Sequence, residues 1–254
     1  MDTKVFYPFI KRVIPVVVTI IIVLWLYIAY GALEYSFNNL AEFFRLTLEH
    51  FFLVIVSMTA AVSIGVSLGT IITRKGFDRF GPAIMAMVNV WQSVPSLGVI
   101  ALAYGFLPII GLSGIGVIPG LIALFFHAVA PIVRNTYAGI QGVSEDVIEA
   151  ATGMGMTQKQ ILFKIELSNA LPVIMGGIRT ATAIIVGTAP LAFLIGGGGL
   201  GFWIFTGIAL MDMGIMMAGA VPVALIAMLF DYTLARLEKI IISKGIQAEE
   251  YQEV

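Results

Sequence analysis

Residues 80–133 read FGPAIMAMVNVWQSVPSLGVIALAYGFLPIIGLSGIGVIPGLIALFFHAVAPIV, a run of 54 residues without Asp, Glu, Lys or Arg. A helix that crosses a bilayer needs about 20 mostly apolar residues, so this run provides two spans and a short connection. The apolar stretches are continuous and do not alternate with period two, which excludes a transmembrane β-barrel. The run therefore predicts an all-α fold, that of a polytopic helical membrane protein.

The composition of the whole chain agrees with this prediction. Of its 254 residues, 59% are apolar and only 11% are charged, whereas an ordinary soluble domain has about 25% charged residues. Fourteen Lys and Arg against fifteen Asp and Glu give a net charge of -1, so there is no polycationic surface for nucleic acid. The chain has no cysteine, which excludes disulfides, thiolate nucleophiles and Cys-ligated metals. A disordered chain, a nucleic-acid binder and a conventional soluble enzyme are all excluded.

The charge-free runs divide the chain into about six spans. We expect transmembrane helices at residues 13–32, 51–73, 81–107, 114–135, 174–195 and 213–234. Lys11 and Arg12 precede the first helix, as in a signal peptide. However, its 18 uncharged residues are long for the hydrophobic core of a signal peptide and no A-x-A site follows at the right place, so we expect an uncleaved anchor.

The positions of Lys and Arg predict the orientation of the spans. If the N-terminus is cytoplasmic, thirteen of the fourteen basic residues lie inside and Arg45 alone lies outside. Such a bias is typical of cytoplasmic loops, and an odd number of spans would destroy it. We therefore expect a multi-pass protein with both termini in the cytoplasm.

The third predicted span is interrupted by polar residues and a proline. Trp91, Gln92 and Ser93 precede Pro95, and Ser96 follows it. Proline removes a backbone hydrogen bond, and in lipid the freed carbonyl is tolerated only where protein or a watery cavity receives it. Two interpretations remain: a packing kink, or a break that lines a translocation path. Under the second, Trp91, Gln92, Ser93 and Ser96 are the candidate path residues.

The longest polar stretch lies between the fourth and fifth spans. Ser144 precedes an acidic first turn, which is typical of a helix N-terminus, and that helix should stop near Gly153 or Gly155. Residues 157–160, Thr-Gln-Lys-Gln, fit a capping box that starts a second helix. We expect a helix–turn–helix at the membrane surface, with a solvated amphipathic linker as the alternative.

The same stretch contains a longer pattern, EAA-x3-G-x9-I-x-L. Its positions are Glu149, Ala150, Ala151, Gly155, Ile165 and Leu167. The pattern resembles the EAA loop of permease subunits of ABC (ATP-binding cassette) importers, although Ser168 stands where that family usually has proline. The resemblance implies that these six residues couple the permease to an ATPase, by docking a short helix into a groove of that subunit. In that role Ala150 and Ala151 would supply a narrow docking face.

Further strings resemble the osmoprotectant branch of these permeases. They are NTYAGI at 135–140, GMGM at 153–156, GIRTAT at 177–182 and IGGGGLG at 195–201. This resemblance implies a MetI-like, type I importer permease, with residues 1–254 as one transmembrane domain and 138–172 as its cytoplasmic coupling loop. It also implies import of glycine betaine, choline or carnitine across a prokaryotic cell membrane.

The resemblance implies partners as well. They are the ABC ATPase subunits, a second permease subunit that is either identical or similar, an extracytoplasmic substrate-binding protein and the lipid membrane. No G-x-x-x-x-G-K-[ST] motif is present, so the chain itself should hold no cofactor, and ATP and Mg²⁺ should bind the partner ATPase. The chain is thus not expected to be an enzyme.

Other functions remain as alternatives. One is a permease for another small solute, such as an amino acid, and the other is an ion-coupled secondary transporter. The charge-free runs hold no mid-membrane acid of the kind that ion coupling uses. A membrane-embedded enzyme would need a nucleophile–base pair or a metal cluster, and the spans contain neither.

A glycine-rich turn follows the fifth predicted span. Gly196, Gly198 and Gly201 match G-x-G-x-x-G, but the dinucleotide fingerprint needs a preceding strand. Together with Gly197 and Gly199, these residues fit a flexible external turn or gate.

Several single residues carry weaker signals. His127 is either a buried, hydrogen-bonded residue, which we favour, or part of the translocation path. Gly65 with Gly69 forms a G-x-x-x-G pattern for a close helix contact. Asp231 either pairs with Arg236 or lies at the interface. The aromatic residues Trp91, Phe202 and Trp203 are candidates for contact with a quaternary ammonium substrate.

Overall fold

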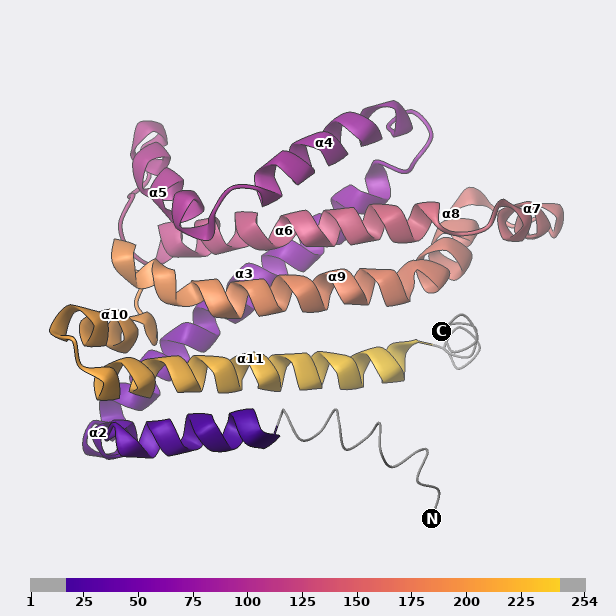
Figure 1. Cartoon of the computed structure of the whole chain (residues 1–254). Helices are drawn as coiled ribbons and strands as arrows, with labels where there is room; N and C mark the ends of the chain where they lie inside the picture. The colour runs from indigo at the N-terminus through magenta and orange to yellow at the C-terminus, as the bar shows by residue number, and fades with distance from the viewer. Residues whose placement is uncertain (1–16, 243–254) are drawn as a thin grey trace, which may run out of the picture.

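The computed structural model describes residues 17–242, and every regular element in that range is helical (Figure 1). The helices after the first, which covers Val17–Ala29, are α2 (Ala32–Asn38), α3 (Leu40–Ile71), α4 (Gly81–Gln92), α5 (Ser96–Phe106), α6 (Val117–Gln141), α7 (Glu145–Gly153), α8 (Gln158–Ile161), α9 (Leu167–Thr188), α10 (Gly201–Leu210) and α11 (Met213–Ile241). Short 3-10 segments cover Asp78–Phe80, Leu107–Ile110 and Ala189–Ile195. Lys4, Lys11, Arg12 and Lys244, on which part of the orientation argument rests, lie outside the described residues.

The long helices account for the predicted spans. Four are long and apolar enough to cross a membrane: Leu40–Ile71, Val117–Gln141, Gln158–Ile195 and Met213–Ile241. Two bent pairs, Val17–Ala29 with Ala32–Asn38 and Asp78–Gln92 with Ser96–Ile110, raise the number to six if each pair is one span. The all-α prediction is confirmed, with up to six spans in the described residues.

The third span is broken rather than kinked. The axis turns by 102° between the segment that ends at Gln92 and the segment that begins at Ser96, and α4 and α5 diverge clearly in Figure 1. Pro95 has φ -59° and ψ 143°. It lacks an N–H for the helix and disfavours helical geometry in Val94. The prediction of one helix over residues 81–107 is therefore wrong, although the position of the interruption is as expected.

The fifth span starts much earlier than predicted. We expected it at residues 174–195, but one helix runs from Gln158 to Ile195. It includes a π-helical turn at Leu162–Glu166, and the side-chain amide of Asn169 donates to the Ile165 carbonyl oxygen at 2.8 Å. The second helix of the polar insert is thus the first part of the fifth span.

The bundle has two ends, which we name from their helices. In Figure 1, α2 and α10 lie together at one end, with α5 near them, and we call this the α10 end. The helices α7 and α8 lie at the opposite end, which we call the α7 end. The long helices α3, α6, α9 and α11 run between the two ends.

Small residues bring the central helices into close contact. A Cβ built on Gly65 would lie 2.8 Å from Ile132 Cγ2, and one on Gly69 would lie 2.6 Å from Thr136 Cβ. The G-x-x-x-G pattern therefore makes the expected contact, between α3 and α6. The crossing of α6 and α9 uses the same principle, because a Cβ on Gly177 would lie 2.6 Å from Asn135 Cβ.

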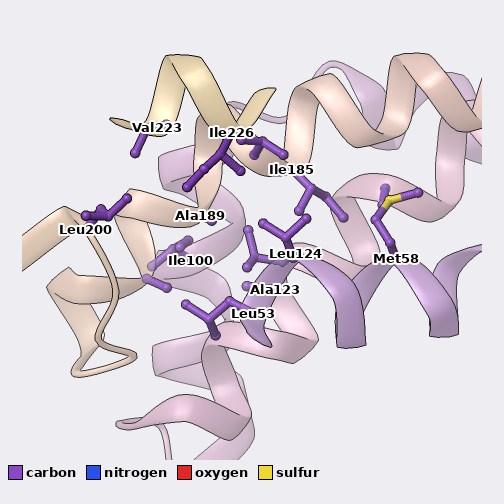
Figure 2. Close-up of a cluster of buried hydrophobic side chains, with 14 of the residues drawn as sticks. Leu53, Met58, Ile100, Ala123, Leu124, Ile185, Ala189, Leu200, Val223 and Ile226 are labelled. Carbon is purple, nitrogen blue, oxygen red and sulfur yellow. The ribbon is translucent and has the colours of Figure 1, made fainter. Parts of the chain in front are cut away.

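The apolar core lies beside these crossings. Side chains from α3, α5, α6, α9 and α11 meet there, with Leu53, Leu124 and Ile185 among them (Figure 2). Each of these three is at most 2% exposed. In lipid, such packing and close backbone approach hold helices together without the hydrophobic driving force that acts in water.

Two neighbouring glycines of α9 test the contact with α6. We expect Gly177→Val to destabilise the protein by about 1–3 kcal/mol, because the added methyl groups overpack the contact with Asn135. Gly176→Val is the matched control, because a Cβ at Gly176 meets nothing within 4 Å. The measurement is the melting temperature in detergent, and equal losses in the two variants would contradict the packing argument.

Candidate translocation path and coupling segment

A polar cavity lies between α4, α6 and α9. Its volume is about 410 Å³, and it is lined by Trp91, Gln92, His127, Pro131, Arg134, Asn135, Thr180 and Ile184. The structure thus brings two of the four predicted path residues, Trp91 and Gln92, to one cavity. Ser93 and Ser96 are not in its lining: the Ser93 hydroxyl instead donates to the Asn89 carbonyl oxygen at 3.3 Å.

The geometry of Trp91 is fixed by α6. Its indole Nε1 donates to the Phe126 carbonyl oxygen at 2.8 Å, and the two rings lie with centroids 5.7 Å apart. Trp91 also lines a second cavity of about 390 Å³, whose other walls, including Val99, Phe106 and Ile122, are apolar. The indole therefore separates a polar cavity from an apolar one.

Of the two alternatives for His127, the favoured one, a buried residue, is wrong. The side chain is only half-buried and lines the polar cavity. His127, Pro131, Arg134 and Asn135 are spaced i, i+4, i+7 and i+8, which places them on one face of α6. That periodicity was present in the sequence and was the signal that would have grouped them.

The polar insert folds as the predicted helix–turn–helix. Gly155 has φ +79° and forms the reversal between α7 and α8, where its N–H donates to the Thr152 carbonyl oxygen at 2.9 Å. Thr157 and Gln160 form the predicted capping box, with the Thr157 N–H donating to Gln160 Oε1 at 2.8 Å. Ser144 precedes α7 as expected, but its side chain makes no capping hydrogen bond.

The two alanines of the EAA pattern do not share one exposed face. Ala150 and Glu149 are exposed, whereas Ala151 is 1% exposed and belongs to the interior of the insert. The prediction that both alanines form a docking face is wrong for Ala151. The exposed apolar surface comes instead from residues that the sequence argument missed, Met154 and Phe163, which are 74% and 68% exposed.

An ion pair ties the insert to the end of α3. Arg74 Nη1 lies 2.6 Å from Glu166 Oε2, and most of both side chains is buried. The same guanidinium donates from Nε and Nη2 to Thr73 Oγ1, at 3.1 and 2.8 Å. Glu166 lies between Ile165 and Leu167 of the EAA pattern, in the π-helical turn, and π-turns are frequent at functional sites. Ile165 and Leu167 are half-buried on either side of it.

A second ion-pair group joins α9 to α11. Arg179 Nη2 lies 2.8 Å from Asp231 Oδ1, and Arg179 Nη1 lies 3.2 Å from Glu238 Oε2. Of the two alternatives for Asp231, pairing with Arg236 is therefore wrong. The guanidinium of Arg236 instead lies over the Tyr232 ring, at 5.1 Å from its centroid.

The glycine turn is held in place by α3. Gly196, Gly198 and Gly199 all have positive φ, between 76° and 80°, so the apolar run cannot continue as one helix and a separate helix, α10, begins at Gly201. The sequence prediction did not include α10. The Gly199 N–H donates to Glu49 Oε2 at 2.9 Å, while Arg45 Nη1 donates to Glu49 Oε1 at 2.7 Å.

Trp203 of α10 is part of the same arrangement. Its Nε1 donates to Glu42 Oε2 at 3.0 Å, and its ring packs against Tyr35 and Phe43 with centroids 5.1 and 5.8 Å apart. Trp203 is 0% exposed. Contrary to the expectation from the sequence, it is therefore not available to a substrate. The ring of Phe202 packs edge-on against Phe193 at 5.6 Å.

The sequence profile of one protein family covers most of this architecture. The family described as "Binding-protein-dependent transport system inner membrane component" matches residues 61–243, from the middle of α3 to the end of α11. The chain belongs to this family. It is therefore a polytopic membrane component of a transport system, rather than a catalytic subunit.

Curated relatives of this transport component are similar over nearly their full length. The osmoprotectant import permease protein OsmY of Salmonella typhimurium is 42% identical over 225 residues, 89% of this chain and 93% of the relative. The glycine betaine/carnitine/choline transport system permease protein OpuCB of Bacillus subtilis is 39% identical over 210 residues, 83% of this chain and 93% of the relative.

A solved structure shows the same fold. A chain of the MetNI methionine ABC transporter, captured in inward-facing conformations, superposes with a TM-score of 0.71 at 23% identity. The match covers 81% of this chain and 99% of that chain. The MetI-like fold predicted from the sequence is thus confirmed.

The ion pair between Arg74 and Glu166 yields a stability prediction. We expect Glu166→Ala to destabilise the transport component by about 1–3 kcal/mol, because it leaves a largely buried guanidinium without its acceptor. The exchanged pair Arg74→Glu with Glu166→Arg should recover part of this loss. Lys75→Gln is the matched control, since Lys75 is the exposed neighbour of Arg74. Melting curves in detergent measure all three, and an exchange no better than Glu166→Ala would contradict the pairing.

Proposed function

We propose that this chain is the permease subunit of an osmoprotectant importer. It would move compounds such as glycine betaine, choline or carnitine from an extracytoplasmic binding protein to the cytoplasm of a prokaryote. The observation that carries the proposal is the 39% identity to a permease named for glycine betaine, carnitine and choline and the 42% identity to one named for osmoprotectant import, each over more than four fifths of the chain. Membership in a family of binding-protein-dependent transport components removes the ion-coupled secondary transporter as an alternative.

The proposal assigns a direction and partners to the two ends of the bundle. The α7 end would face the cytoplasm, with the insert docked on an ATPase subunit through Glu149 and Ala150 of α7 and the exposed apolar side chains Met154 and Phe163. The α10 end would face the binding protein. A second permease subunit completes the path, both termini lie in the cytoplasm, and ATP with Mg²⁺ binds the ATPases.

The polar cavity and the broken third span support a path along α4, α6 and α9. Polar side chains inside a membrane protein are expensive unless they face protein or water. Gln92, Asn135 and Thr180 come from three different helices and converge on one cavity. A packing kink at Pro95 would not require this convergence.

Reconstitution tests the proposed function. The permease, its ATPase and its binding protein are placed in proteoliposomes, and uptake of labelled glycine betaine is measured with and without ATP. We expect uptake only when all three proteins and ATP are present, with competition by choline or carnitine. Uptake that persists without the ATPase would contradict the proposal, and competition by an amino acid alone would favour a permease for amino acids.

The proposed orientation predicts a labelling pattern. The chain has no cysteine, so Arg45→Cys and Lys159→Cys each introduce a single reactive thiol, at the α10 end and the α7 end. A membrane-impermeant maleimide added to whole cells should label residue 45 and leave residue 159 unlabelled until the cells are opened. Labelling of both residues from the same side would contradict the topology.

Two glycines of the insert test its role in coupling. Gly155 has φ +79°, which costs a residue with a side chain about 1 kcal/mol or more. We expect Gly155→Asp to shift the reversal and leave ATP hydrolysis of the complex unresponsive to loaded binding protein, with the spans still inserted.

Gly153→Asp is the matched control, because Gly153 lies two residues earlier, has no positive φ and meets nothing within 4 Å of its Cβ. The assay is ATPase activity with and without loaded binding protein. Full stimulation of the Gly155→Asp complex would show that this reversal is not part of the coupling element.

A further inference from the structure

One positively charged side chain, that of Arg134, lines the polar cavity. Arg134 is the only Asp, Glu, Lys or Arg among the residues of α6 and among those that line the cavity. The Arg134 side chain is exposed within the described residues, and its Nη1 donates to Gln92 Oε1 over a long distance of 3.5 Å. Arg134 lies in the last third of α6, at the end of the fourth predicted span.

The cavity also has an aromatic wall. Trp91 forms a wall between the polar and the apolar cavity, and its indole is held by the hydrogen bond to Phe126. Trp has the strongest cation–π attraction of the aromatic side chains.

These groups match the two ends of a zwitterion. An arginine fork binds a carboxylate with two parallel hydrogen bonds, while an indole face suits a quaternary ammonium group. A cation without a carboxylate would meet the guanidinium uncompensated, because the lining holds no acid. The volume of about 410 Å³ falls in the range of small-molecule sites, about 300–1,000 Å³.

We propose that this cavity is a substrate subsite within the permease that favours zwitterionic quaternary ammonium compounds, with Arg134 as the carboxylate group's partner and Trp91 as the ammonium group's. The inference rests on the proposed function. It adds a selectivity step at the permease: glycine betaine and carnitine carry a carboxylate, and choline does not.

The test uses the complete importer in proteoliposomes, with the binding protein saturated by labelled glycine betaine or by labelled choline. Arg134→Gln should lower the ratio of the maximal uptake rates, glycine betaine over choline, about tenfold, as expected for the loss of a charged hydrogen-bond pair. Trp91→Leu should lower both rates together and leave the ratio within about twofold, because both compounds carry the ammonium group.

Arg79→Gln is the control, since Arg79 is exposed, lies outside the cavity lining, and packs over Phe80. It should change neither rate. If Arg134→Gln does not assemble, Arg134→Lys replaces it: the charge stays, the fork is lost, and the ratio should fall in the same direction by a smaller factor.

The outcomes separate the two proposals. A parent importer that transports neither compound with ATP would overturn the proposed function. A parent that transports glycine betaine, combined with Arg134 variants whose ratio is unchanged, would overturn the subsite and leave the proposed function standing. A parent that transports choline but not glycine betaine would overturn the subsite as well.

Discussion

The close approach of α3, α6 and α9 is the constraint on which the rest of the structure depends. Lipid provides no hydrophobic driving force between helices, so these three are held by small residues that let the backbones meet. Gly65 and Gly69 receive Ile132 and Thr136 of α6, and Gly177 receives Asn135 from the other side. Asn135 also lines the polar cavity. The contact that fixes α6 against α9 therefore also fixes one wall of the candidate path.

The helix α3 carries polar anchors at both of its ends. At the α10 end, Glu49 accepts from the Gly199 N–H and Glu42 accepts from the Trp203 indole; at the α7 end, Arg74 just after the helix pairs with Glu166. A buried pair of this kind contributes little net stability against an apolar alternative. Its contribution here is to positioning: through polar contacts at both of its ends, α3 sets the positions of the glycine turn and of the insert relative to each other.

Much of this was predictable from the sequence, for definite physical reasons. Charge-free runs that are long enough to cross a bilayer predicted the spans. Helix-capping residues and a glycine at the reversal predicted the helix–turn–helix of the insert. The glycines at 196, 198 and 199 indicated a turn but not that α10 follows it, because Gly201–Leu210 has only 10 residues, too few for a span. Ala151 and Glu166 show the other limit. Periodicity does not reveal that a small residue faces inward or that a glutamate meets an arginine 92 residues away.

The continuity of the helix from Gln158 to Ile195 links the insert to the cavity. The sequence favoured two separate helices, and with a flexible joint a displacement of α8 would end there. In the structure the same helix that begins at the Thr157 capping box carries Thr180 and Ile184 into the cavity wall. The intervening turns belong to one helix, which rises about 1.5 Å per residue. Ion pairs hold this helix at Glu166, through Arg74, and at Arg179, through Asp231. A rotation imposed on the insert must therefore either break these pairs or move the cavity wall.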